Sequence, residues 1–162
     1  MALEVKDRKI IGEIDNLEDK LEGKLAINRL ELLVLVNSWG RDNDFYTNDN
    51  IKIHECKQKE CYNLSKLDTS QITDMTQLFA YSMFNDIHST NGIGLHNGDI
   101  SNWNVSKVTD MRAMFIGAEK FNQALDNWNV SNVTSMSYMF QDATEFNQAL
   151  DRWDVSTVTN MN

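Results

Sequence analysis

Hydrophobic residues recur at a fixed interval through the second half of the chain. Trp103, Trp128 and Trp153 are 25 residues apart, and around each tryptophan the same apolar skeleton returns. A period of about 20–50 residues is typical of stacked repeat architectures, because one short unit cannot bury its own apolar face. The pattern predicts a continuous core that contains Trp103, Trp128, Trp153, Val105, Val130, Val155, Met111, Met136, Phe115 and Phe140.

Each repeat unit also predicts its own local structure. In residues 125–133 the apolar positions follow L-x-x-W-x-V-x-x-V, which is the spacing of a leucine-rich repeat with tryptophan in one leucine position. The alternation of Trp128 and Val130 predicts a short strand whose two side chains leave on one face. In residues 134–140 the apolar spacing changes to three and four, which predicts a short helix with Thr134 as its N-cap.

The same interval predicts how the chain is divided. Residues 61–162 hold about three and a half coils of 25 residues, and the break in spacing before Ile100 predicts a surface insertion at residues 86–97. Residues 1–60 lack the repeat and are expected to form a helical N-terminal cap, since an array needs its ends covered. The expected fold class is therefore α+β, a leucine-rich-repeat-like solenoid of short strands and short helices.

The cap has its own hydrophobic pattern. Apolar residues at spacings of three and four predict an amphipathic helix over residues 10–25. Residues 30–36 (LELLVLV) are apolar on all sides; both helix and strand fit them, and we favour a helix that ends near Gly40. A polar loop over residues 41–50 and a short helix over residues 50–60 complete the cap. An independent effector or dimerisation helix pair is the alternative interpretation.

The repeat motif resembles a known family. W-[ND]-V-S-x-V-T-x-M-x-x-M-F followed by F-N-Q is similar to the bacterial surface-protein repeat of about 26 residues, a domain of unknown function related to the BspA-like leucine-rich repeats. The resemblance covers residues 64–162. It implies a right-handed repeat solenoid on surface or secreted bacterial proteins that mediates protein–protein contact. It implies no enzyme and supplies no catalytic residues.

Charge narrows the class of partner. The formal net charge is −9, with 24 acidic against 15 basic residues. Nucleic acid binding requires clusters of Lys and Arg that neutralise phosphates, so nucleic acid and anionic membrane surfaces are disfavoured. No apolar run is long enough to span a bilayer. Residues 1–25 lack the apolar centre of a signal peptide, whereas the resemblance points to the cell surface, so the sequence leaves the location open.

Polar residues between the buried strand positions are the predicted contact residues. Stacking would place them in ladders about 4.8 Å apart, where they either bond to one another and to the backbone or present a polar face to a protein partner. The insertion would add two histidines to this surface. The predicted partner-binding residues are Asp68, Asn104, Asn129, Asp154, Ser106, Ser131, His88 and His96.

Metal binding and catalysis have weak support. His54, Cys56 and Cys61 form H-x-C-x₄-C without a second ligand pair, so free thiols or a disulfide are favoured over zinc. His88 and His96 are an equally weak metal pair. The ladder has too few converging carboxylates for calcium. No phosphate-binding glycine loop and no serine–histidine–aspartate arrangement is evident, so we expect neither a cofactor nor an enzyme.

The predicted function is a non-enzymatic protein–protein interaction module, adhesin-like or host-interacting. The alternative is a purely structural stalk that spaces other domains. The sequence stops at Asn162, where a further helical turn of the repeat would begin. Because an uncovered coil exposes apolar surface and backbone edge, we expect either that the natural protein continues or that this end self-associates.

Overall fold

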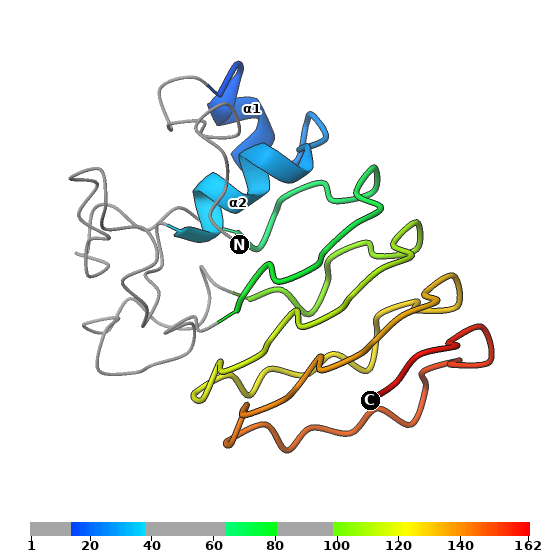
Figure 1. The fold of residues 1–162 in the computed structure, drawn as a ribbon. Helices are drawn as coiled ribbons and strands as arrows, with labels where there is room; N and C mark the ends of the chain where they lie inside the picture. The colour runs from blue at the N-terminus through cyan, green and yellow to red at the C-terminus, as the bar shows by residue number, and fades with distance from the viewer. Residues whose placement is uncertain (1–13, 38–63, 81–98) are drawn as a thin grey trace.

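The computed structural model of the chain describes residues 14–37, 64–80 and 99–162. It contains two helices in these ranges, α1 (Leu17–Leu21) and α2 (Arg29–Asn37), which lie at one end of a stack of irregular coils (Figure 1). We name these coil 1 (residues 64–80), coil 2 (99–123), coil 3 (124–148) and coil 4 (149–162). Neither helix is long and apolar enough to cross a membrane.

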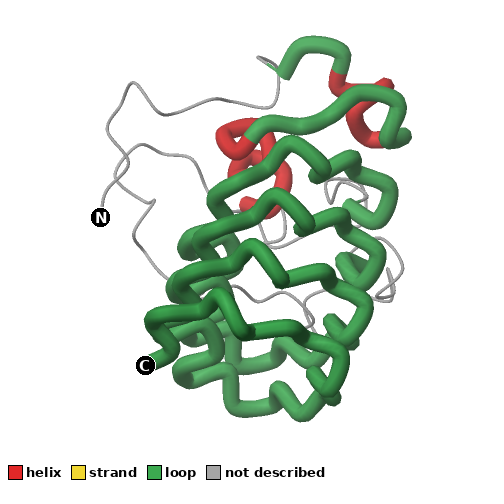
Figure 2. The backbone as a smooth tube through the Cα atoms, turned by 90° about the vertical axis from the view of Figure 1, so that its right-hand side faces the viewer, coloured by secondary structure: helices red, strands yellow, loops and turns green. Residues whose placement is uncertain are grey.

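The coils stack in register along one side. Isolated parallel bridges join residue 74 of coil 1 to residue 110 of coil 2, then to residue 135 and residue 160. Beside each bridge, a threonine N–H donates to the carbonyl of the equivalent threonine in the coil before, at 2.8–2.9 Å. Figure 2 shows the coils as parallel rungs, one beneath the other. The column of threonines consists of Thr73, Thr109, Thr134 and Thr159.

A single hydrophobic cluster runs through the stack and into α2. Phenylalanine rings stack between successive coils: the centroids of Phe79 and Phe115 are 5.3 Å apart, and those of Phe115 and Phe140 are 5.5 Å apart. Trp103 is 3% exposed and Trp128 is 2% exposed. The coils therefore bury each other's apolar faces.

Each tryptophan also fixes the register between two coils. The indole N–H of Trp128 donates to the Ile100 carbonyl of coil 2 at 3.0 Å, and the indole N–H of Trp153 donates to the Leu125 carbonyl at 2.9 Å. Trp103 makes the equivalent bond to Leu64 at 2.8 Å. A buried indole needs such an acceptor, so the residue that fills the core also aligns one coil on the next.

The predicted α+β solenoid of short strands and short helices is wrong. The described part of the chain contains no strand, and helices occur only in α1 and α2. Trp128 and Val130 do point inward, but the backbone there closes local turns: the N–H of Trp128 donates to Leu125, and the N–H of Val133 donates to Val130. Pairing between coils occurs instead at the bridges, away from the alternating segment.

The predicted helix at residues 134–140 is also wrong. Tyr138 has a φ of 57°, and the equivalent residues Gln77 and Ala113 have φ values of 55° and 51°, in the left-handed region that ends a helix. The N–H groups of Met136 and Tyr138 donate to coil 4, at Asn160 and Asn162, so they cannot form helical bonds. The hydroxyl of Thr134, predicted as an N-cap, donates to the Thr109 carbonyl.

Helix α2 confirms the helical prediction for residues 30–36. Asn28 and Glu31 form a capping box: the Asn28 side-chain oxygen accepts from the Glu31 N–H, and the Glu31 carboxylate accepts from the Asn28 N–H. Glu31 is 2% exposed and its carboxylate is 2.6 Å from the Lys20 ammonium of α1. A buried carboxylate is tolerated because it has this cation and these donors, and the pair joins the two helices.

The long helix predicted over residues 10–25 is much shorter within the described residues. It is observed as α1, after which the chain turns at Gly23 with a φ of 73°. A side chain at Gly23 would overlap the Lys66 carbonyl oxygen of coil 1, so glycine is required for the close approach. The predicted loop 41–50, helix 50–60 and insertion 86–97 lie outside the described residues.

Arg29 supplies hydrogen-bond donors to backbone carbonyls of coil 1. Between inner coils, N–H groups two residues apart donate to carbonyls of the next coil, for example Met111 to Ser135 and Ala113 to Ser137. In coil 1 the corresponding carbonyls belong to Asp74 and Thr76, and the Arg29 guanidinium donates to them at 2.8 and 2.7 Å. One planar side chain thus replaces two backbone donors of a preceding coil.

Candidate protein-binding surfaces

The predicted polar ladder forms one edge of the stack, built from four equivalent turns. In each turn an Asp or Asn side-chain oxygen accepts from the backbone N–H of the serine two residues later, at 3.0–3.2 Å. This bond is an Asx turn, which reverses the chain after the buried segment. We call this surface the turn edge; its residues are Asp68, Ser70, Asn104, Ser106, Asn129, Ser131, Asp154 and Ser156.

The turns hold their side chains rigidly. The hydroxyls of Ser106 and Ser131 also donate to Asn104 and Asn129, both at 2.7 Å, so each amide oxygen accepts two hydrogen bonds. Both asparagines are exposed, and their amide nitrogens have no hydrogen-bond partner in the described parts of the chain. The edge therefore presents fixed amide donors to solvent.

The turns at the two ends of the edge carry aspartate. Hydrogen bonds from the Ser156 hydroxyl and N–H lower the pKa of the exposed Asp154 carboxyl below its ordinary value, so this group is charged at neutral pH. Asp68, in coil 1, accepts from the Ser70 N–H. The turn edge is therefore neutral in its middle and acidic at both ends.

Side chains beside the turn edge link successive coils. The Asn132 amide donates to the Ser106 carbonyl at 2.7 Å, and the Thr157 hydroxyl donates to the Ser131 carbonyl at 2.8 Å. In coil 2 the Lys107 ammonium donates to the Gln71 side chain at 3.0 Å. These contacts leave little freedom in the turns, so a ligand would meet a preorganised surface.

The predicted histidines and cysteines cannot be placed. His88 and His96 of the insertion, and His54, Cys56 and Cys61 of the cap, lie outside the described residues. Within residues 14–37, 64–80 and 99–162, no group of three or more His, Cys, Asp or Glu side chains is arranged to hold a metal ion.

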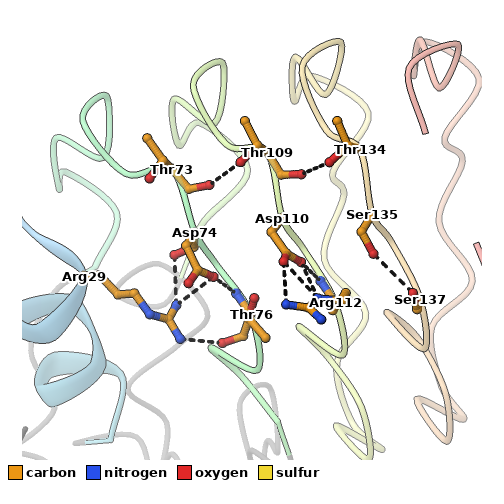
Figure 3. A network of polar contacts seen from close by, with 10 residues as sticks. All are labelled: Arg29, Thr73, Asp74, Thr76, Thr109, Asp110, Arg112, Thr134, Ser135 and Ser137. Carbon is orange, nitrogen blue, oxygen red and sulfur yellow. Dashed lines mark hydrogen bonds and ion pairs between the residues drawn. The ribbon is translucent and has the colours of Figure 1, made fainter. Parts of the chain in front are cut away.

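A second polar surface was missed in the sequence. It follows the bridges, and Figure 3 shows the threonine column beside charged pairs. The Asp110 carboxylate binds the Arg112 guanidinium at 2.8 Å, and Asp74 accepts from the Thr76 N–H at 2.8 Å. The recurring motif T-x-M could have indicated this surface. Thr134 was instead interpreted as a helix cap, and the residues that follow the threonines were not compared with one another.

Arg112 controls the charge of this surface. Burial alone would raise the pKa of Asp110, but hydrogen bonds from the Arg112 side chain and backbone, together with its positive charge, outweigh burial and hold this pKa below its ordinary value. The Arg112 pKa is raised by the same partner. Because the charges of Asp110 and Arg112 compensate each other, this surface attracts an ionic ligand less strongly than its composition suggests.

The third surface is apolar and is formed by residues of coils 3 and 4. Val155 is 38% exposed and Met161 is 58% exposed, although the repeat pattern placed Val155 in the core. No further described coil covers this side, so the core position is open there. We call this surface the terminal face; its residues are Tyr138, Phe140, Trp153, Val155 and Met161.

The comparisons with known proteins identify one family. Residues 50–162, more than half of the chain, match the model of a family described as Mycoplasma protein of unknown function, DUF285. No curated protein and no solved structure matches the chain. The match agrees with the expected domain of unknown function, and it is coarser than the repeat of about 26 residues to which the motif was compared.

Proposed function

Because the chain belongs to the DUF285 family of Mycoplasma proteins of unknown function, we propose that it is a non-enzymatic protein-binding module of the BspA-like repeat type. Its role would be adhesin-like or host-interacting. The proposed contact residues are those of the turn edge, Asp68, Asn104, Asn129, Asp154, Ser106 and Ser131, together with His88 and His96, which lie outside the described residues. The observation that carries the proposal is the repeated Asx turn.

The turn supports binding because it fixes a polar group before any ligand arrives. Asn104 and Asn129 each use the amide oxygen internally and expose the amide nitrogen, at equivalent places in neighbouring coils. Binding to such a group does not require ordering of a flexible side chain, which costs about 0.5–1.5 kcal/mol per side chain at an ordinary surface. Carbonyl and carboxylate oxygens of a protein partner are the acceptors that suit these donors.

The test removes the donors while keeping the turns. Asp68 and Asp154 make the same turn with a carboxylate, so Asn104→Asp with Asn129→Asp should preserve the backbone and remove both amide donors. The matched control, Ala124→Asp with Ala149→Asp, adds the same two charges at exposed alanines. Both variants would be immobilised beside the original chain and exposed to an extract of the native environment, and captured proteins would be identified by mass spectrometry.

We expect the original chain and the alanine control to capture the same partner, and the asparagine variant to lose it. Chemical denaturation should give all three proteins unfolding free energies within about 1 kcal/mol of each other. Equal capture by the asparagine variant would show that the turn edge is not the contact surface.

A second candidate function is a structural spacer without a specific partner. The observation that favours it is the internal use of the turn edge: the side-chain oxygens close turns, and Asn132 and Thr157 bond to the coil before. A spacer needs a regular stack and no ligand. Failure of the original chain to capture any protein in the same experiment would support this function.

A further inference from the structure

We propose that Asn104 and Asn129 are acceptors for a sugar, which a glycosyltransferase attaches to the side-chain amide nitrogen. The donor is a sugar carried on a diphosphate. Both asparagines begin the motif N-V-S, which has the N-x-[ST] form of the asparagine-linked glycosylation signal. The inference goes beyond the proposed function, because it assigns a covalent modification to the turn edge and needs no protein partner there.

The motif recurs in the described residues, and the structure separates its copies. It begins at Asn104, Asn129 and Asn132, and a further copy begins at Asn63, outside the described residues. Asn104 and Asn129 are exposed, and their amide nitrogens have no hydrogen-bond partner in the described parts of the chain. The Asn132 nitrogen instead donates to the Ser106 carbonyl at 2.7 Å. An enzyme can therefore reach the first two nitrogens, whereas the third is held against the coil before it.

The serine of each N-V-S motif is bonded to the asparagine that begins it. The Ser106 hydroxyl donates to the Asn104 side-chain oxygen at 2.7 Å, and the Ser106 N–H donates to the same oxygen at 3.0 Å. Ser131 and Asn129 make the same two bonds at 2.7 and 3.2 Å. The Thr134 hydroxyl, in the third motif, donates to a carbonyl of coil 2 instead. Of the described motifs, only the two N-V-S copies combine an exposed nitrogen with a doubly bonded oxygen.

These hydrogen bonds act on the step in which the nitrogen reacts. An amide nitrogen is a weak nucleophile, because its lone pair is shared with the carbonyl oxygen. As the nitrogen gives up a proton, negative charge develops on that oxygen, and donors already aimed at developing charge lower the barrier. The serine hydroxyl and N–H are such donors. The folded turn thus prepares Asn104 and Asn129 for proton removal by a base of the transferase.

The reaction is a substitution without oxidation or reduction. The amide nitrogen forms a bond to the anomeric carbon of the sugar, and the bond between this carbon and the diphosphate oxygen breaks. The electron pair leaves with the diphosphate, and the amide proton passes to the base of the transferase. The nitrogen keeps one hydrogen and the amide oxygen keeps both of its hydrogen bonds, so the turn is preserved.

The turns at the two ends of the edge cannot be modified in this way. Asp68 and Asp154 occupy the equivalent positions, and a carboxylate has no nitrogen. Sugar attachment is thus confined to the turns of coils 2 and 3. A sugar there would cover part of the surface that the proposed function assigns to a protein partner.

The test is mass spectrometry of the protein as its source cells produce it. The intact mass shows whether sugar is present, and fragmentation by electron transfer, which leaves side-chain groups attached, locates it. We expect sugar at Asn104, at Asn129 or at both, and none at Asn132.

Variants made in the same cells test the role of the hydroxyl. Ser106→Ala with Ser131→Ala keeps both asparagines and should reduce the modified fraction to less than about a tenth, since it removes one of the two donors at each oxygen. Ser106→Thr with Ser131→Thr keeps the hydroxyls and should retain the sugar. The matched control is Ser156→Ala, which makes the same change in the turn of Asp154 and should leave the modification unchanged. Circular dichroism should show all variants folded.

Three outcomes would overturn the proposal. These are Asn104 and Asn129 both unmodified in the original protein, Asn132 modified as fully as they are, and undiminished modification after Ser106→Ala with Ser131→Ala. Sugar content is read from the mass and partner capture from the immobilised chain. Failure of the proposed function and failure of this inference can therefore be distinguished.

Discussion

Coils 3 and 4 carry nearly the same sequence and differ in what covers them. Val130 is 1% exposed and its counterpart Val155 is 38% exposed. Met136 is 6% exposed, whereas Met161 is 58% exposed. The residue types and the spacing are identical, so burial here is decided by the neighbouring coil and not by the coil's own sequence.

The comparison also shows how the two ends of the stack differ. At the first end the neighbour of coil 1 is not a coil: α2 covers the apolar face, and Arg29 binds the carbonyls of Asp74 and Thr76. At the last described coil, the terminal face keeps an apolar surface, and the Thr159 carbonyl and the Met161 N–H have no partner among the described residues. Each coil provides only half of an interface, so its burial depends on the element beside it.

The largest expected effect compares Trp128 with Trp153. Trp128→Ala removes a buried indole and its hydrogen bond to Ile100, and should lower the free energy of unfolding by about 3–5 kcal/mol. Trp153 is only partly buried, so Trp153→Ala should cost roughly 1–2 kcal/mol. Denaturation in urea, followed by circular dichroism, would measure both values.

Met161→Ala is the control for this comparison, because more than half of that side chain is already in solvent. It should change the free energy of unfolding by less than about 0.5 kcal/mol. Equal costs for the two tryptophan variants would mean that Trp153 is covered as completely as Trp128, contrary to its partial burial in the structure.

A smaller effect is expected at the closed end. Arg29→Ala leaves two carbonyls of coil 1 without their donors, and should lower the free energy of unfolding by about 1–3 kcal/mol. Arg29→Lys should fall between Ala and Arg, since an ammonium group cannot match two carbonyls with a planar pair of donors. Thermal denaturation of the three proteins would establish the order.

The matched control is Arg112→Ala. Arg112 is also an arginine beside the bridges, but its guanidinium is exposed and binds only the Asp110 side chain among the contacts described. Its loss should lower the free energy of unfolding less than the loss of Arg29 does, because an exposed surface ion pair contributes little to stability. If Arg29→Ala cost no more than Arg112→Ala, the carbonyl bonds of Arg29 would not be closing the stack.

The sequence correctly predicted which side chains of the inner coils are buried, because the apolar side chains themselves determine burial. The 25-residue interval gave the inward positions of Trp103 and Trp128, because a large apolar residue at a fixed place must share one interior. It failed for the backbone. The spacing of Met136, Met139 and Phe140 resembles a helix, yet the N–H groups of this segment bond to coil 4 and Tyr138 is left-handed.

At the candidate sites, too, the residues were predicted better than their hydrogen bonds to the backbone. Bonding of the ladder residues to the backbone was one of the two predicted alternatives, but the Asx turn itself was not predicted, although D-x-S and N-x-S recur at each turn and both first residues favour this bond. The role of Arg29 could not be predicted, since its partners are 45 and 47 residues away and are recognised only as carbonyls, which every residue has. A contact between one side chain and distant backbone that occurs only once leaves no repeating pattern in the sequence.

The smallest expected effect compares Asp110 of coil 2 with Ser135, which occupies the same bridge position in coil 3. The Asp110 pKa is lowered in the folded chain because Arg112 outweighs burial. Its ionised form therefore contributes stability above the unfolded pKa of about 3.9, and this contribution is lost as the pH falls through the lower folded value. Asp110→Ser, which copies coil 3, should remove it.

We expect the melting temperature of Asp110→Ser to lie slightly below that of the original chain at pH 7, by an amount equivalent to less than about 1 kcal/mol. The difference should begin to shrink below about pH 4, where the unfolded chain takes up the proton. It should vanish at lower pH, once Asp110 is protonated in the folded chain too and its ion pair with Arg112 is lost. Added salt should reduce the difference at pH 7, since the pair is partly exposed. A difference that stays constant from pH 7 to pH 2.5 would assign the effect of the substitution to the local backbone at Asp110, where its side chain accepts from the Arg112 N–H, and not to its charge.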